Sequence, residues 1–257
     1  MNALVTGGTG TLGRHVVTRL RQSGHRARIF SRHPRGHVDA VQGDLKTGIN
    51  LAKALQGMDA VVHCATGARD SLTARATDVR GTKRLLEASS KAGIKHFVYP
   101  SIVGMEGVPY PYYRTKLRAE ALVKDGGLPW SILRATQFHE LMEVFLGIFS
   151  RVPGLTTIPF AWQFQPVASA EVARRIVDAV LAEPGGMLPD FGGPEVRDFK
   201  SIAESWLAAT HRHRRLVNLR LPMRFSRQWA EGKLLTPNHK DGKITFEQYL
   251  AEKYPQP

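Results

Sequence analysis

The sequence has one cysteine, Cys64, and no long run of apolar residues. A single cysteine excludes an intramolecular disulfide framework and a cysteine-rich zinc site. The most apolar stretch, residues 141–149, is interrupted by Glu143 and falls short of the ~20 apolar residues that span a bilayer. Because the first residues already predict a strand, we expect no signal peptide, no membrane partner and a cytoplasmic location.

Acidic residues and catalytic clusters are also scarce. The chain has 22 Asp and Glu against 36 Lys and Arg, a formal net charge of +14. The excess lies mainly in residues 1–50 and 197–233, and it favours either a phosphorylated ligand or an ordinary solvated surface. Its densest run, residues 211–215, has no interleaved aromatic side chains, so no nucleic-acid partner is expected. No His, Asp and Glu cluster has metal-ligand spacing and no Gly-x-Ser-x-Gly elbow occurs, so we expect no metal.

Short apolar runs alternate with amphipathic stretches along the first 135 residues. The pattern predicts strands at residues 3–5, 27–30, 38–42, 60–64, 96–99 and 130–134. It predicts helices at about residues 12–23, 51–56, 77–92 and 112–124. Strands that alternate with helices indicate βαβ units, and therefore an α/β fold with a doubly wound parallel sheet.

The alternation loosens after Arg134. Helices are predicted at about residues 136–150 and 169–182, and a capping box of Thr245 and Gln248 predicts a last helix. We expect one domain over residues 1–257. Residues 1–135 would form the dinucleotide-binding core, and residues 136–257 would contribute a small C-terminal lobe on the substrate side.

A glycine-rich turn follows the first predicted strand. Gly7, Gly10 and Gly13 are spaced three apart and open an amphipathic helix. Gly7 permits a tight turn, Gly10 lets the backbone approach a pyrophosphate, and Gly13 lets the helix pack close to the strand. The helix N-terminus then presents free N–H groups to phosphates. The turn therefore predicts a bound dinucleotide.

The end of the second predicted strand indicates which dinucleotide binds. An NAD-specific site usually has an acidic residue there for the ribose 2′-hydroxyl, and this chain has none. Arg32 and Arg35 instead offer guanidinium groups suited to a 2′-phosphate, with Arg14 as a third candidate. Asp44, after the third strand, is a candidate acceptor for the adenine amino group. We therefore predict NADP(H) as the cofactor.

Taken together, these segments resemble the short-chain dehydrogenase/reductase superfamily, in particular its atypical, NmrA-like NAD(P)-binding group. The matching segments run in the family's order across about residues 1–180: residues 6–13, 43–45, 61–65, 78–82, 97–101, 112–116 and 130–136. The resemblance implies a Rossmann core of about seven parallel strands. It also implies a nicotinamide site at the ends of the fourth to sixth strands. Further cofactor contacts follow from it at Thr6, Thr11, Leu12, Ser31, Leu45, Ala65, Thr66, Ala135 and Thr136.

The candidate catalytic residues are Ser101, Tyr112 and Lys116, which resemble the superfamily's Ser–Tyr–Lys set. Tyr112 and Lys116 are four residues apart and share one face of a helix. A neighbouring ammonium is expected to lower the pKa of Tyr112, which would protonate a carbonyl oxygen, while Lys116 would also hold the nicotinamide ribose. Ser101 would bind the substrate oxygen. In the isoflavone-reductase-like branch the lysine alone handles the proton, so Lys116 is the stronger candidate, and Tyr110 and Tyr113 are alternatives to Tyr112.

Other side chains keep two interpretations. We interpret His63 as a core or cofactor-edge residue and Cys64 as a small buried apolar residue. His139 and Glu140 are either substrate-site residues or ordinary residues at a helix start. A set of large apolar side chains also has two interpretations, which are equally good: an apolar or aromatic substrate pocket, or core packing. These side chains are Phe138, Met142, Phe145, Phe160, Trp162 and Phe164.

Two functions are compatible with this sequence. The first is an NADPH-dependent oxidoreductase that reduces a carbonyl, enone or quinone of a small, apolar or aromatic substrate. The alternative is a non-catalytic NADP(H)-binding redox sensor of the NmrA type. The complete set of Ser101, Tyr112 and Lys116 favours the enzyme, because a sensor does not need it. A monomer and a homodimer remain equally open.

Overall fold

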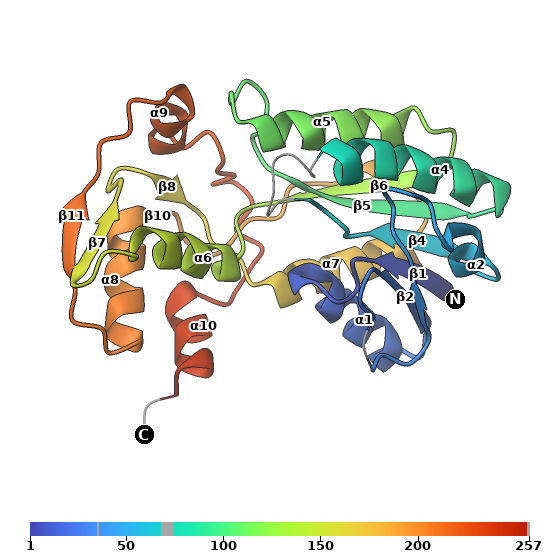
Figure 1. Cartoon of the computed structure of the whole chain (residues 1–257), viewed down its shortest axis with the longest axis horizontal. Helices are drawn as coiled ribbons and strands as arrows, with labels where there is room; N and C mark the ends of the chain where they lie inside the picture. The colour runs from blue at the N-terminus through green and yellow to red at the C-terminus, as the bar shows by residue number, and fades with distance from the viewer. Residues whose placement is uncertain (35, 68–74, 256–257) are drawn as a thin grey trace. The chain divides into compact units, whose positions relative to one another are not determined.

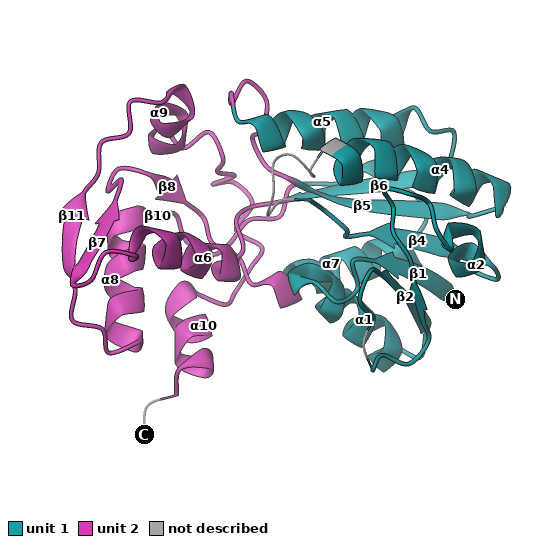
Figure 2. Ribbon diagram, viewed as in Figure 1, with its two compact units in different colours: residues 1–101, 110–134, 172–189 teal, residues 102–109, 135–171, 190–257 magenta. Residues whose placement is uncertain are grey.

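The computed structural model describes residues 1–34, 36–67 and 75–255. Arg35, one of the predicted cofactor residues, lies outside these ranges. The chain divides into two compact units, shown in Figure 2. Unit 1 contains residues 1–101, 110–134 and 172–189, and unit 2 contains residues 102–109, 135–171 and 190–257.

Unit 1 is built on a seven-stranded parallel sheet with the order β3-β2-β1-β4-β5-β6-β9 (Figure 1). The strands are β1 (Asn2–Thr6), β2 (Arg26–Ser31), β3 (Ala40–Gln42), β4 (Ala60–His63), β5 (His96–Ile102), β6 (Trp130–Ala135) and β9 (Gly186–Met187). The order reverses between β1 and β4, which is where doubly wound sheets bind ligands. The predicted Rossmann-type fold is confirmed.

Helices cover both faces of this sheet. In Figure 1, α4 (Thr82–Lys91) and α5 (Pro111–Lys124) lie on one face, and α1 (Thr11–Gln22) and α7 (Ser169–Leu181) lie on the other. A short helix, α2 (Leu51–Leu55), packs against α4. The sequence pattern explains this arrangement, because α1 buries Leu12, Val16, Val17 and Leu20 along one face.

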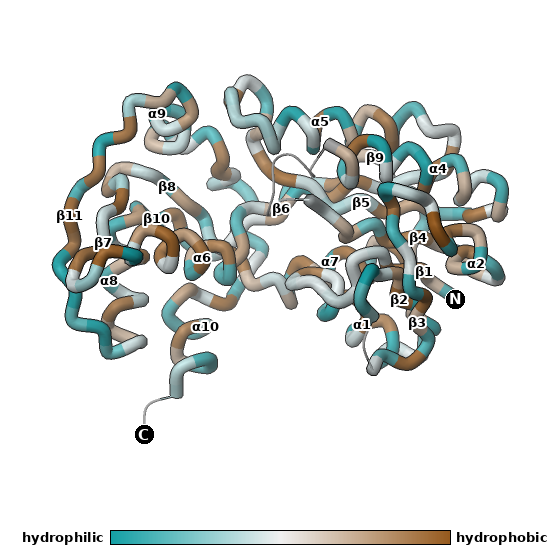
Figure 3. Tube along the Cα trace, in the orientation of Figure 1, coloured by the Kyte–Doolittle hydropathy of each residue, from teal (hydrophilic) through white to brown (hydrophobic). Residues whose placement is uncertain are grey.

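One hydrophobic cluster in the core of unit 1 lies between the sheet and helices α2, α4 and α5. Phe30, Phe97 and Tyr99 come from the strands, and Leu85 and Leu51 come from the helices. Each such side chain contributes roughly 1.5–3 kcal/mol when it is fully buried. Figure 3 shows the hydrophobic residues of the strands in brown, in agreement with the near-continuous apolar runs expected of a parallel sheet.

One predicted helix starts differently. The stretch expected as a continuous helix over residues 77–92 begins with a π-helix, η1 (Arg75–Gly81), and becomes regular only at α4. The Thr82 hydroxyl donates to the Asp78 carbonyl oxygen at 2.8 Å and so competes for an acceptor of the α-helical ladder. The periodic pattern of apolar residues, from which the helix was predicted, does not reveal this competing hydrogen bond.

Unit 2 consists of short helices and two small sheets. Strand β7 pairs in parallel with β11, and β8 pairs antiparallel with β10. Its elements are α6 (His139–Phe149), β7 (Leu155–Ile158), β8 (Gln163–Phe164), β10 (Arg197–Asp198), α8 (Phe199–Ala209), β11 (Arg215–Asn218), α9 (Arg224–Ala230) and α10 (Phe246–Lys253). The capping box predicted at Thr245 and Gln248 is confirmed and begins α10.

Acidic side chains of unit 2 hold its C-terminal helix. Glu143 of α6 accepts hydrogen bonds from the hydroxyl of Tyr254 at 2.6 Å, from the hydroxyl of Tyr249 and from the ammonium of Lys253. Burial opposes ionisation of Glu143, yet these three donors outweigh it and lower the pKa of this carboxyl. The cluster ties α10 to α6.

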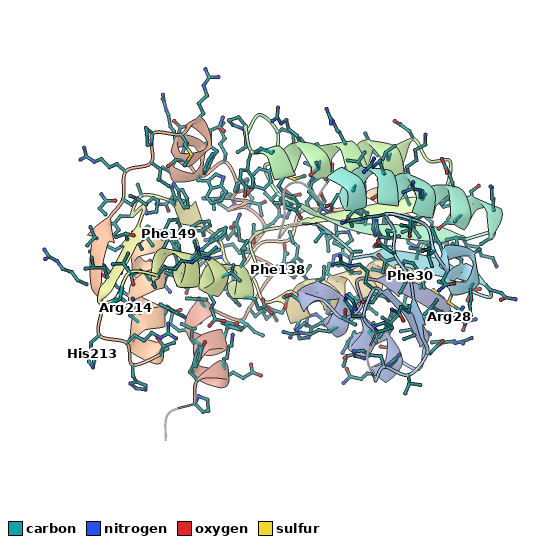
Figure 4. All side chains as sticks on the ribbon, viewed as in Figure 1. Arg28, Phe30, Phe138, Phe149, His213 and Arg214 are labelled. Atoms are coloured by element: carbon teal, nitrogen blue, oxygen red, sulfur yellow. The ribbon has the colours of Figure 1, made fainter. Side chains whose placement is uncertain are left out.

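Arginines cap helices in both units. Arg28 donates to the carbonyl oxygens of Ala54 (3.0 Å) and Gln56 (2.8 Å) at the end of α2. Arg214 donates to Ser150 and Val152 just after α6, at 2.9 and 3.0 Å. Figure 4 labels both arginines. Cations stabilise helix C-termini, so part of the positive excess that the sequence concentrates in two segments serves the fold.

Candidate active site

The glycine-rich turn adopts the geometry that its glycines predict. Gly7 has φ +65°, and a Cβ there would lie 2.8 Å from the Ala65 backbone. A Cβ on Gly13 would lie 2.2 Å from the Gly7 carbonyl oxygen. At Gly10 the corresponding distance is 3.2 Å. At Gly7 the turn therefore approaches the backbone that follows β4, and at Gly13 helix α1 approaches the turn, more closely than a side chain allows.

The end of α1 that follows the turn fits a phosphate group. Gly10 is the N-cap and makes no side-chain capping hydrogen bond, and the first turn of α1 contains no acidic residue. Thr11 and Leu12 begin the helix, and Leu12 is buried. The first N–H groups of a helix carry a partial positive charge. A dinucleotide pyrophosphate therefore fits this turn.

Of the residues predicted to surround the adenosine half of the dinucleotide, some are exposed and others make contacts within the protein. Ser31 ends β2 and its hydroxyl lies 3.1 Å from the Thr9 hydroxyl, beside the glycine-rich turn. Arg32 and Arg14 are exposed. Asp44 accepts the backbone N–H of Lys46 at 2.8 Å, and the neighbouring Leu45 is buried in the core.

Lys116 and Tyr112 lie on α5, one turn apart, but they contact different partners. The Tyr112 hydroxyl lies 2.9 Å from the Thr66 hydroxyl, just after β4. The Lys116 ammonium donates to the Tyr99 hydroxyl at 2.7 Å and to the Pro100 carbonyl oxygen at 2.8 Å, both on β5. Helix α5 therefore connects the ends of two neighbouring strands.

Burial governs the charge of both groups. Lys116 is only 5% exposed, and burial lowers its pKa to about 8, although the carboxylates of Asp78 and Glu120 act in the opposite direction. Burial raises the pKa of Tyr112, and the nearby Asp78 raises it further. The expectation that Lys116 lowers the pKa of Tyr112 is therefore wrong, because the ammonium turns to β5 and the phenol is desolvated.

Ser101 is buried near the end of β5. Its hydroxyl oxygen has almost no solvent-accessible surface and no hydrogen-bond partner among the described residues. Glu120 lies beside it and pairs with Arg134 through two contacts of 3.0 and 2.7 Å. Burial opposes ionisation of Glu120, but the hydrogen bonds from Arg134 hold the pKa of this carboxyl below its usual value. Among the described residues, no hydrogen bond joins Ser101 to Tyr112 or Lys116.

The side chains at the end of β4 are structural. His63 is buried between the hydroxyls of Thr6 (2.7 Å) and Thr82 (2.9 Å), and burial lowers its pKa to about 3. The same Thr6 hydroxyl accepts the Ala65 N–H. Burial raises the pKa of the Cys64 thiol to about 12. The interpretation of His63 as a core residue is confirmed, whereas Cys64, interpreted as a small buried apolar residue, is only half-buried.

Four of the predicted site residues belong to unit 2, and their contacts lie within that unit. Ala135 is buried, and the Thr136 hydroxyl donates to the Gln165 carbonyl oxygen at 2.6 Å and accepts the Gly193 N–H. His139 is fully buried and stacks on Tyr249. Glu140 accepts from the Ser169 hydroxyl at 2.5 Å.

The large side chains of unit 2 mostly form its core. Trp162 lies between Phe199, at 6.0 Å between ring centroids, and Trp229, at 4.6 Å. Phe164 and Met142 are fully buried. For Met142, Trp162 and Phe164 the interpretation as core packing is confirmed, whereas Phe138, Phe145 and Phe160 are half-buried.

Two residues of the site were not predicted from the sequence. Tyr99, which contacts Lys116, lies in the family segment 97–101, but apart from that it resembles in sequence any aromatic residue of a buried strand. Asp78 is 1% exposed, accepts the Gly67 N–H at 2.8 Å, and acts on the pKa of Lys116. The only sequence signal for Asp78 was its place in the family segment 78–82.

Neither a metal centre nor a membrane helix appears in the described part of the chain. No three His, Cys, Asp or Glu side chains gather there in an arrangement that would hold a metal ion. Likewise, none of the helices in residues 1–34, 36–67 and 75–255 combines the length and the apolar character needed to cross a bilayer.

The doubly wound sheet and the glycine-rich turn of Gly7, Gly10 and Gly13 define an NAD(P)-binding protein of the Rossmann type. Comparison with known proteins supports this class. Residues 7–151 match the family described as NAD(P)H-binding. The chain belongs to this family. The NAD(P)-binding Rossmann character implied by the resemblance of the sequence segments is thereby confirmed.

Curated relatives of this chain include both an enzyme and an assembly factor. It is 35% identical over 149 residues to the photosystem II assembly factor Ycf39 of Synechocystis sp., covering 54% of this chain and 46% of the relative. It is 34% identical over 188 residues to a 3 beta-hydroxysteroid dehydrogenase/Delta 5-->4-isomerase of Mycobacterium tuberculosis, covering 56% and 51%. The chain spans about half the length of the curated relatives it matches.

Solved structures share the fold. A short-chain dehydrogenase/reductase superfamily protein from Agrobacterium tumefaciens with bound NAD has a TM-score of 0.75 and 24% identity, covering 98% of this chain and 95% of that one. At this identity the likeness concerns the fold alone.

Proposed function

We propose that this protein is an NADPH-dependent oxidoreductase that reduces a carbonyl, enone or quinone group of a small, apolar or aromatic molecule. The observation that carries the proposal is on α5, where a buried lysine with a pKa of about 8 lies one turn from a tyrosine hydroxyl. A group that titrates near neutral pH is suited to proton transfer. A dinucleotide-binding protein without catalysis does not need this pair.

The site residues have distinct roles in this proposal. Bound NADPH supplies a hydride. The glycine-rich turn and the start of α1 hold its pyrophosphate, and Lys116 binds the ribose. Tyr112 stays protonated at neutral pH, because its pKa is raised, and donates a hydrogen bond to the substrate oxygen. The hydroxyl proton of Tyr112 passes to the substrate oxygen as the hydride is transferred, and Lys116, which holds an exchangeable proton at Nζ, restores the proton that Tyr112 has lost. Unit 2 contributes the substrate-side lobe.

A turnover assay tests the catalytic part. The purified protein is mixed with NADPH and a panel of quinones, enones and aromatic ketones, and loss of the reduced nicotinamide absorbance is followed. We expect oxidation of NADPH with at least one of these classes. Tight NADPH binding without turnover on any of them contradicts the enzyme and supports the redox sensor, which the relationship to an assembly factor also makes a candidate.

Cofactor preference depends on Arg32 in this proposal. NADP(H) should bind at least ~10-fold more tightly than NAD(H), because one or two charge-assisted contacts to the 2′-phosphate contribute ~1.5–3 kcal/mol each. Calorimetric titration of both dinucleotides measures this ratio. Arg32→Ala should remove most of it, whereas Arg19→Ala, at an exposed position near the far end of α1, should not. Equal affinities in the wild-type protein would refute the preference.

A further inference from the structure

Lys116 is held by strand β5 and not by the tyrosine of its own helix. Its ammonium donates to the Tyr99 hydroxyl at 2.7 Å and to the Pro100 carbonyl oxygen at 2.8 Å, and it lies 4.0 Å from the centroid of the Tyr99 ring. Tyr99 is only 1% exposed. Within the part of the chain that the structure describes, two of the three ammonium donors are therefore engaged, which leaves the third for another acceptor.

The two acceptors differ in what they can do when the lysine changes charge. The Pro100 carbonyl only accepts hydrogen bonds, whereas a tyrosine hydroxyl both accepts and donates. When Lys116 is an ammonium, Tyr99 accepts from it. When Lys116 is a neutral amine, the Tyr99 hydroxyl can donate to the nitrogen lone pair. The contact with Tyr99 is thus compatible with both protonation states of Lys116.

Other titratable groups surround this pair from every neighbouring element. Asp78 of η1 and Glu120 of α5 act on Lys116 as carboxylates, and Glu120 is itself paired with Arg134 of β6. At the end of β4, Cys64 and His63 face the same ammonium, and both are uncharged near neutral pH. Tyr112 of α5 and Tyr99 itself have raised pKa values, mainly through burial, so neither phenol ionises near neutral pH. Burial also raises the pKa of Asp78, so Lys116 and Asp78 are the two groups of this cluster whose pKa values burial moves toward neutral pH.

We propose that Tyr99 is a positioning residue for Lys116, and that its hydroxyl keeps the lysine nitrogen in one place while that nitrogen gains and loses a proton. Strand β5 then sets the pH range in which Lys116 binds the dinucleotide ribose and exchanges its proton. The proposal rests on the proposed function of Lys116 and adds to it the residue that controls the lysine.

The test measures the titration of Lys116 directly. Protein with ¹³C-labelled lysine is titrated by NMR without substrate, and Lys116→Arg identifies the Lys116 signal by its loss. The wild-type midpoint should be about 8. Tyr99→Phe should lower it by at least about half a pH unit, a roughly three-fold change in the protonation ratio, because the ammonium loses a charge-assisted acceptor. An unchanged or raised midpoint would overturn the proposal.

Two further measurements separate positioning from a general loss of structure. Tyr254→Phe removes another tyrosine hydroxyl that contacts a charged group, Glu143 in unit 2, and should leave the Lys116 midpoint in place. In the wild-type protein, the ring ¹³Cζ signal of Tyr99 should move with the same midpoint as Lys116, a prediction that needs no variant. A Tyr99 signal that stays constant across that range contradicts the proposal even if Tyr99→Phe does not fold.

NADPH titrations across pH connect this result with function. Affinity should be full while Lys116 is an ammonium, below its pKa, and should fall as the pH rises through it. In Tyr99→Phe this fall should occur at lower pH. If the NMR midpoints shift as expected but no substrate is turned over, the positioning role stands and the proposed enzyme function fails. If turnover is found but the midpoints do not shift, the positioning role fails alone.

Discussion

Lys116→Ala is expected to lose both NADPH affinity and reductive rate. One ammonium serves the ribose and the proton supply in the proposed mechanism, so its removal acts on both steps. Loss of one charge-assisted hydrogen bond, ~1.5–3 kcal/mol, should weaken NADPH binding by ~10-fold or more. The rate of hydride transfer should fall by ~10²-fold or more, the usual contribution of a positioned proton-transfer group.

Single-turnover kinetics and dinucleotide titration of the same variants measure these effects. Lys116→Met fills most of the same volume without a charge, and it should behave like Lys116→Ala if charge and not packing is responsible. Should either variant retain wild-type rate and affinity, Lys116 has neither role.

Tyr112→Phe provides the comparison on the same helix. The ring still packs, and only the hydroxyl that lies 2.9 Å from Thr66 is lost. NADPH affinity should stay near the wild-type value, while the chemical step slows by ~10²-fold. Full activity in Tyr112→Phe with loss in Lys116→Ala would favour chemistry by the lysine alone. If neither change affects turnover, Tyr110, Tyr113 and His139 would be tested next.

Gly13→Ala is expected to abolish useful dinucleotide binding. The added Cβ would lie 2.2 Å from the Gly7 carbonyl oxygen and 2.9 Å from the Gly8 Cα. Both neighbours are backbone atoms that cannot rotate away, so the turn and α1 must separate. Overpacking of this kind costs ~1–3 kcal/mol of stability. The displaced turn should lower NADPH affinity by ~10²-fold, because phosphate binding needs the helix N–H groups in place.

Gly147→Ala is the matched control for this substitution. Gly147 lies in α6 of unit 2, and a Cβ there meets no atom within 4 Å. Alanine should stabilise the helix by up to ~1 kcal/mol and leave NADPH binding unchanged. Thermal melts and calorimetric titrations of both variants make the comparison. Normal NADPH affinity in Gly13→Ala would mean that the turn does not bind the pyrophosphate.

Sequence patterns accounted for most of the sheet and for the position of the turn. The alternation of apolar runs with amphipathic stretches located six strands of unit 1 within a few residues, because burial on both faces demands near-continuous apolar strands. The spacing of Gly7, Gly10 and Gly13 located the turn, because only glycine allows backbones to approach so closely. Both signals are local and are therefore visible along the chain.

The contacts of the candidate site depended on the tertiary structure. The i, i+4 spacing placed Tyr112 and Lys116 on one face of α5, but it could not show that Lys116 donates to Tyr99, 17 residues earlier on β5. It could not show that the Ser101 hydroxyl is buried without a hydrogen-bond partner among the described residues, or that burial raises the pKa of Tyr112 and lowers that of Lys116. Hydrogen-bond partners and desolvation arise only when a strand and a helix pack together, and they decide which of these groups carries a proton at neutral pH.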